Sequence, residues 1–101
     1  MSSAVQQREI PTVTNTGWTR LDPDPLINRT YVVILNNHPT QAMGLACTMG
    51  ETPTSNWDTR RRVMQNSSSP YFKAGAAIAF WGRMETGPVA SGSAIVVDEW
   101  A

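Results

Sequence analysis

The chain has 101 residues, which suits one domain, because two separate cores of half this size would each be too small to be stable. Its eight Lys and Arg residues balance its eight Asp and Glu residues, and a neutral chain lacks the basic excess that is typical of nucleic-acid-binding proteins. Hydrophobic residues make up 41% of the chain and charged residues 16%, a composition that argues against both intrinsic disorder and a coiled coil.

Residues 1–17 are polar, with isolated apolar side chains at Val5, Ile10 and Val13. This pattern predicts an extended N-terminal arm, followed by a single folded domain over residues 18–101. The three apolar side chains are candidates for a protein interface, because an arm of this kind can add a strand to the sheet of a neighbouring molecule. The alternative is a frayed chain end.

Residues 18–29 are expected to form a stiff, extended lead-in, since two of them directly precede prolines. Residues 30–35 (TYVVIL) are the clearest strand, with β-branched or aromatic side chains at most positions. Both faces of this strand are apolar, which predicts burial on both sides, one of them available as a subunit interface. A second strand is predicted over residues 42–48, and the short connection before it favours an antiparallel hairpin.

Residues 49–70 form a long polar segment, and connections of this length in small domains are often functional. Residues 57–64 could add one or two helical turns. The segment also carries Trp57 and the cluster Arg60, Arg61 and Arg62. Trp and Arg are common in protein interfaces, so these four residues are further interface candidates. The alternatives are a solvated loop and, less favoured, contact with nucleic acid.

Further strands are predicted over residues 76–81 and 94–97, separated by turns rich in Gly, Pro and Ser. Short strands between such turns, with no long helical pattern, indicate an all-β fold. We expect a small antiparallel β-sandwich or barrel of the jelly-roll kind.

No catalytic, cofactor or metal site is expected from the sequence. One cysteine, Cys47, excludes an internal disulfide and a zinc site built from cysteines, and one histidine excludes a His-rich metal site. Cys47 is expected to act as a small packing residue. The carboxylate pairs Asp22/Asp24, two residues apart, and Asp98/Glu99 are expected to be solvated. There is no apolar signal region and no run long enough to cross a membrane, which predicts a soluble chain without a membrane partner.

An ordered series of short motifs then becomes visible across residues 20–99: Leu21 to Pro25, Asn28-Arg29, the apolar strand with Asn36-Asn37, Lys73-Ala74-Gly75, Ser91-Gly92, and Ile95 to Glu99. This series resembles small β-sandwich structural proteins of tailed bacteriophage virions, of the head-decoration (cement) or head-fibre type. The chain departs from that pattern in the longer, more basic segment 49–70, and in Met43-Gly44-Leu45, where the family has an Ile-Gly strand.

The resemblance implies a non-enzymatic virion protein on the capsid surface. It would bind the major capsid protein, or neighbouring copies of itself in a homo-oligomer such as a trimer. The alternative is a carbohydrate- or receptor-binding module of a fibre or other appendage, which would stack an exposed Trp57 or Trp81 on sugar rings. Position along the chain also predicts a structural ion pair between Arg29, just before the first core strand, and Glu99, at the end of the last one.

Overall fold

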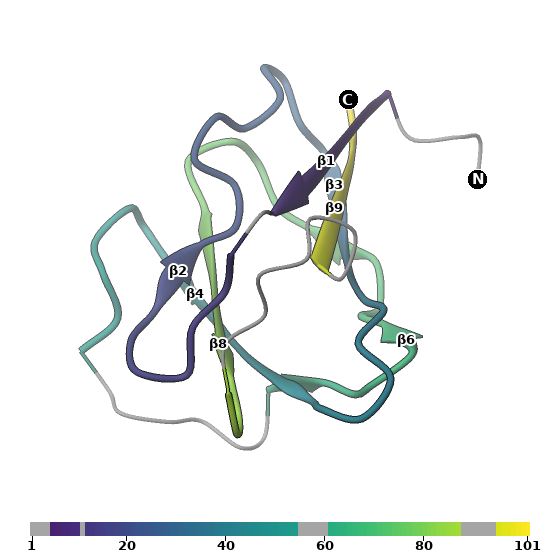
Figure 1. Cartoon of the computed structure of the whole chain (residues 1–101). Coiled ribbons are helices and arrows are strands. Elements are labelled where there is room, and N and C mark those ends of the chain that lie inside the picture. Colours follow the sequence, from purple (N-terminus) through teal and green to yellow (C-terminus); the bar gives the residue numbers. More distant parts are fainter. Residues whose placement is uncertain (1–4, 11, 55–60, 88–94) are drawn as a thin grey trace.

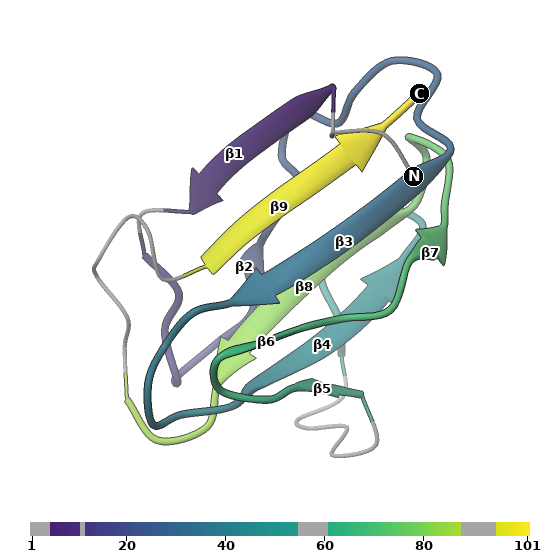
Figure 2. The same cartoon turned by 90° about the vertical axis from the view of Figure 1, so that its right-hand side faces the viewer.

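The protein is seen in a computed structural model, which describes residues 5–10, 12–54, 61–87 and 95–101. These residues form nine strands and no helix, arranged as two antiparallel sheets packed face to face (Figures 1 and 2). The fold is therefore all-β and consistent with the small β-sandwich expected from the sequence.

The first sheet has the order β1-β9-β3-β6, and the short strand β7 also pairs with β3. Its strands are β1 (Gln6–Ile10), β3 (Tyr31–Asn36), β6 (Ser67–Ser68), β7 (Phe72–Lys73) and β9 (Ile95–Trp100). The central pair is β3 and β9, in a register that sets Tyr31 opposite Trp100 and Asn36 opposite Ile95. The last strand therefore lies beside the first long core strand, which brings the two ends of the domain together.

The second sheet lies behind the first in Figure 2 and has the order β2-β8-β4-β5. Its strands are β2 (Thr19–Arg20), β4 (Met43–Thr48), β5 (Arg62–Val63) and β8 (Ala79–Met84). Gly82 on β8 faces the core between two large side chains. A Cβ atom at this position would lie 2.7 Å from the Met43 sulfur and 3.1 Å from a Leu21 methyl carbon, so only glycine fits without a shift of its neighbours.

The core fills the space between the sheets with one side-chain set from each. Val32, Ile34, Ile95 and Val97 come from the first sheet, and Met43, Leu45, Val63, Phe80 and Met84 from the second. These side chains alternate with outward-facing ones along each strand, as expected for strands with one face on the core. Full burial of each is worth about 1.5–3 kcal/mol, which makes this layer the main source of stability.

The structure places the expected N-terminal arm differently. Gln6–Ile10 form strand β1, which pairs with β9 of the same chain along its whole length. Ile10 is 6% exposed and Val13 is fully buried, and both belong to the core. Much of residues 1–17 is thus part of the sandwich, because their isolated apolar side chains find a core within their own chain. Val5 alone of the three apolar side chains is exposed, at 63%.

The strands 31–36 and 43–48 do not form the expected hairpin. β3 pairs with β9 in one sheet and β4 pairs with β8 in the other, so residues 37–42 cross from one sheet to the other. Asn36 explains the crossing, because its buried side chain donates hydrogen bonds to the backbone oxygens of Gln41 (2.9 Å) and Val63 (3.0 Å). The helical turns considered for residues 57–64 are absent from their described part, where Arg62–Val63 form β5.

Candidate functional site

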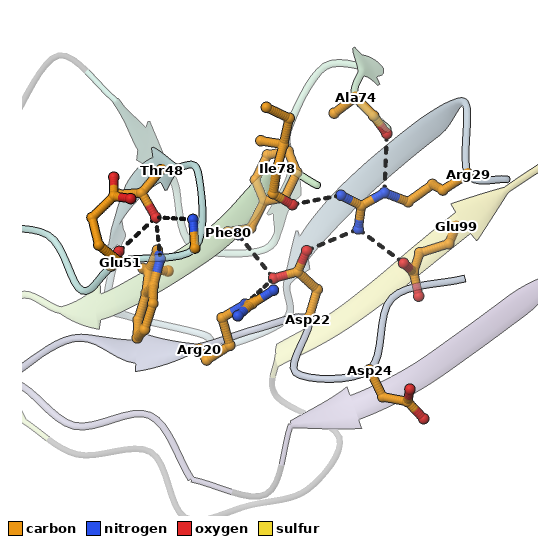
Figure 3. Close-up of polar contacts among 12 residues, drawn as sticks. Arg20, Asp22, Asp24, Arg29, Thr48, Glu51, Ala74, Ile78, Phe80 and Glu99 are labelled. Carbon is orange, nitrogen blue, oxygen red and sulfur yellow. Dashed lines mark hydrogen bonds and ion pairs between the residues drawn. The ribbon is translucent and has the colours of Figure 1, made fainter. Parts of the chain in front are cut away.

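Five charged side chains are joined by ion pairs, and we call them the ion cluster: Arg8, Arg20, Asp22, Arg29 and Glu99. Figure 3 labels all of them except Arg8. Asp22 and Glu99 are fully buried and Arg29 is 3% exposed. Charged groups are almost never buried unless they are paired. The hydrogen-bond partners of these buried charges therefore indicate whether the cluster is structural or is free to react with a ligand.

Arg29 is the centre of the ion cluster, and all five of its guanidinium N–H groups have acceptors. Its Nη1 donates to Asp22 Oδ2 (2.8 Å) and to Glu99 Oε2 (2.9 Å), which is the ion pair expected from the sequence. Its Nε donates to the backbone oxygen of Ala74 (3.0 Å), and its Nη2 to those of Gly75 and Ile78 (2.8 Å each). The preceding residue, Asn28, has a left-handed backbone (φ 62°), a conformation that Asn tolerates and that turns the chain into β3.

Asp22 joins the ion cluster to the second sheet. Its Oδ1 accepts hydrogen bonds from Arg20 Nε (2.7 Å) and from the backbone N–H of Phe80 on β8 (2.8 Å). The guanidinium carbon of Arg29 lies 5.3 Å from the centre of the Phe80 ring, which adds a cation–π contact. Asp22 was expected to be solvated; it is buried instead, because partners from β2, β8 and the chain before β3 converge on it.

Glu99 joins the ion cluster to the first sheet and to β1. Its Oε1 accepts from the side-chain amide of Gln6 (2.7 Å) and from Arg8 Nη2 (3.3 Å), and its Oε2 from the backbone N–H of Leu26 (3.1 Å) as well as from Arg29. Burial on its own would raise the pKa of Glu99. The hydrogen bonds from Leu26, Gln6 and Arg29, together with the charge of Arg8, outweigh burial and hold the pKa below its ordinary value.

Both carboxylates of the ion cluster therefore accept hydrogen bonds from several protein donors. A catalytic acid or base must exchange a proton with a substrate, and here each carboxylate oxygen of Asp22 and Glu99 is buried and already accepts a hydrogen bond from a protein donor. The arrangement fastens the two sheets, the N-terminal strand and the loop of residues 74–78 to one another. Its chemistry is structural.

The interface candidates are distributed around the molecule rather than gathered. Arg61 and Arg62 are exposed beside β4, where Arg61 O accepts from the Leu45 N–H and Arg62 Nη2 pairs with Glu85 Oε2 at 2.6 Å. Trp57 and Arg60 lie outside the described residues. Ile10 and Val13 are committed to the core, so Val5, Arg61 and Arg62 are the candidates that the described structure leaves at the surface.

Trp81 is poorly suited to stack on a sugar. It is 9% exposed, the Arg20 guanidinium covers its ring at 5.7 Å, and its Nε1 donates to Thr48 Oγ1 at 2.9 Å. Cys47 is half-buried on β4. Burial raises the pKa of the Cys47 thiol, and the neighbouring Arg61 guanidinium only partly offsets this effect.

Three polar residues organise the interior and were not identifiable as such from the sequence. They are Asp22, Asn36, and Gln41, whose Oε1 accepts from the backbone N–H groups of Thr86 (2.7 Å) and Gly87 (2.8 Å). The Asp22 and Gln41 partners on β8 and in the loop after it lie 58 and 45 residues away. No local pattern marks such residues in advance, since Asp and Asn before a proline or in a turn are read as loop residues.

Comparison of the chain with known protein families, curated proteins and solved structures found no match. The described residues hold no cluster of three or more His, Cys, Asp or Glu side chains that could bind a metal ion. Nor does any helix long and apolar enough to cross a membrane occur among them.

Proposed function

We propose that this chain is a non-enzymatic structural protein of a virion, a capsid decoration protein that binds the outer surface of the major capsid protein and stabilises the head. The resemblance of its sequence motifs to small phage sandwich proteins supports this proposal. The ion cluster also supports it, because its buried charges pair with one another and stabilise the fold.

The observation that carries the proposal is an apolar end of the sandwich, formed by Val5, Ile27 and Tyr71. These side chains are 63%, 80% and 55% exposed and come from three separate segments. All three segments meet the C-terminal end of β9. The Val5 N–H donates to Glu99 O (3.0 Å), Leu26 beside Ile27 donates to the Glu99 carboxylate, and the Tyr71 ring lies 5.3 Å from that of Trp100.

Apolar side chains exposed singly are ordinary, whereas several at one end of a small domain are typical of a protein-binding surface. An end that presents apolar side chains fits a repetitive, flat partner such as a capsid lattice. The absence of net charge allows many copies to sit close together on that lattice, because it removes long-range repulsion between them.

A sedimentation assay with particles assembled without this chain tests the proposal. The wild-type chain should pellet with the particles, and Ile27→Asp should weaken attachment at least tenfold, since it places a charge in the apolar end. Met64→Asp is the matched control, because Met64 is also exposed (46%) but lies at the other end of β9. Its neighbour Val63 on β5 accepts a hydrogen bond from Asn36, and Asn36 pairs with Ile95 at the start of β9.

Attachment that is equally strong for wild type and Ile27→Asp would overturn the apolar end as the binding surface. No attachment of the wild-type chain would overturn the decoration function. Specific binding of the isolated chain to a glycan array would favour the alternative, a carbohydrate- or receptor-binding module.

A further inference from the structure

A pocket opens between the two sheets on the side of β5 and β7, and none of its lining side chains is a carboxylate of the ion cluster or one of the three side chains of the apolar end. Its volume is about 520 Å³, within the range of about 300–1,000 Å³ that is usual for small-molecule sites. It is lined by Leu45, Cys47, Arg61, Arg62, Ser69, Pro70, Phe72, Lys73, Ala74, Ile78 and Phe80.

The inner wall of this pocket is almost entirely apolar. Leu45 and Phe80 are buried members of the core, and Phe72 and Ile78 are half-buried side chains that pack against it. The Phe72 and Phe80 rings lie 5.6 Å apart, one from each sheet. An apolar guest that enters here would extend the hydrophobic core and remove both its own surface and the exposed parts of Phe72 and Ile78 from water.

The charged side chains of the pocket are all cationic and all exposed: Arg61, Arg62 and Lys73. No Asp or Glu residue of the described chain lines it. Arg62 is paired with Glu85 at 2.6 Å, while Arg61 and Lys73 form no ion pair with a carboxylate among the described residues. Two cations at the mouth of an apolar pocket thus have no anionic partner within the part of the chain that the structure describes.

We propose that this pocket binds a small amphipathic anion, an acyl chain with a carboxylate head. The chain inserts between Leu45, Phe72 and Phe80, and the head lies between Arg61 and Lys73. An arginine fork binds a carboxylate through two parallel hydrogen bonds, and a lysine adds a point charge. This inference is independent of the capsid function, because none of the residues that line the pocket belongs to the apolar end.

Isothermal titration calorimetry with decanoate below its micelle concentration tests the inference. Decanoate should bind with a stoichiometry of one. Decanol, with the same chain and no charge, should bind at least tenfold more weakly, and decyltrimethylammonium should bind more weakly still. No decanoate binding, or binding of all three compounds with equal affinity, would overturn the proposal.

Two variants locate the site. Ile78→Trp fills the pocket from a half-buried position and should abolish decanoate binding. The double variant Arg61→Gln/Lys73→Gln changes only exposed side chains and should weaken decanoate at least tenfold while leaving decanol unchanged. It keeps the test decisive if Ile78→Trp does not fold.

Arg83→Gln is a control for charge outside the pocket. It removes one positive charge, half of what the double variant removes, from β8, where Arg83 Nε donates to Asn15 O. It should bind decanoate like the wild type. A loss of binding in Arg83→Gln as large as in the double variant would mean that decanoate responds to net charge alone, and it would overturn the proposed site.

Discussion

Arg29 and Arg61 both border the space between the sheets, yet they are held in opposite ways. Arg29 is buried with every N–H group bonded, because Glu99 of β9 and Asp22, just after β2, each supply a carboxylate and the loop of residues 74–78 supplies three backbone oxygens. Arg61 is exposed at the pocket, where no carboxylate among the described residues pairs with it. An arginine side chain is therefore buried where carboxylates surround it, as at position 29. At position 61, where no described carboxylate pairs with it, an arginine stays exposed beside an open pocket.

The largest expected effect follows from breaking the ion cluster. Arg29→Met should lower the free energy of unfolding by about 3–5 kcal/mol, because it leaves two buried carboxylates without their cation. Arg29→Lys should not restore stability, since an ammonium group has three donors where five are used. Urea denaturation measures both. Arg61→Met is the control and should change stability by no more than about 0.5 kcal/mol. Equal losses at the two positions would refute the comparison.

Close packing behind the ion cluster gives the next effect. Gly82→Ala should cost about 1–3 kcal/mol, because its methyl group would meet Met43 and Leu21. Gly17→Ala should be nearly neutral, since a Cβ atom there has no neighbour within 4 Å. Thermal unfolding of the two variants is sufficient to compare them. A neutral Gly82→Ala would mean that the core between β2, β4 and β8 repacks freely.

Acid should weaken the ion cluster selectively. The pKa of Glu99 is lowered by folding, so its contribution is fully present above its ordinary value of 4.5 and is lost as the pH falls through the lower folded value. The stability difference between wild type and Glu99→Gln should therefore shrink from pH 7 to pH 3, because a protonated Glu resembles Gln. Urea titrations at each pH measure this difference. A constant difference over that range would show that the charge of Glu99 does not stabilise the fold.

The smallest effect is expected at the pocket wall. Cys47→Ala should cost about 1 kcal/mol or less, since the side chain is small and half-buried. The raised pKa of the Cys47 thiol leaves less thiolate at pH 8, so iodoacetamide should react with it more slowly than with free cysteine. Bound decanoate should slow the reaction further. A Cys47 that reacts faster than free cysteine would contradict both the burial and its effect on the pKa.

Local patterns predicted much of the framework. The apolar runs place strands at 30–35, 42–48, 76–81 and 94–97, and the structure has them at 31–36, 43–48, 79–84 and 95–100. Shifts of one to three residues are ordinary, because strand ends depend on the partner strand as well as on side-chain preference. The Arg29–Glu99 pair was also accessible to sequence reasoning, since each residue adjoins a strand that had to lie in the core.

Only the tertiary structure decided which strands pair, what becomes of the N-terminal segment, and where the pocket opens. Alternation along a strand shows which side chains face inward, but it does not show which of two sheets the strand joins. The hairpin predicted for strands 30–35 and 42–48 is therefore wrong, because β3 and β4 lie in different sheets. Ile10 and Val13 look isolated in the sequence, and they are buried because a core from distant residues surrounds them. Asp22 and Arg61 both lie among ordinary loop residues in the sequence. Asp22 belongs to the buried ion cluster, whereas Arg61 lies at the rim of the pocket. Their environments differ because contacts between residues far apart in the chain determine burial and charge pairing.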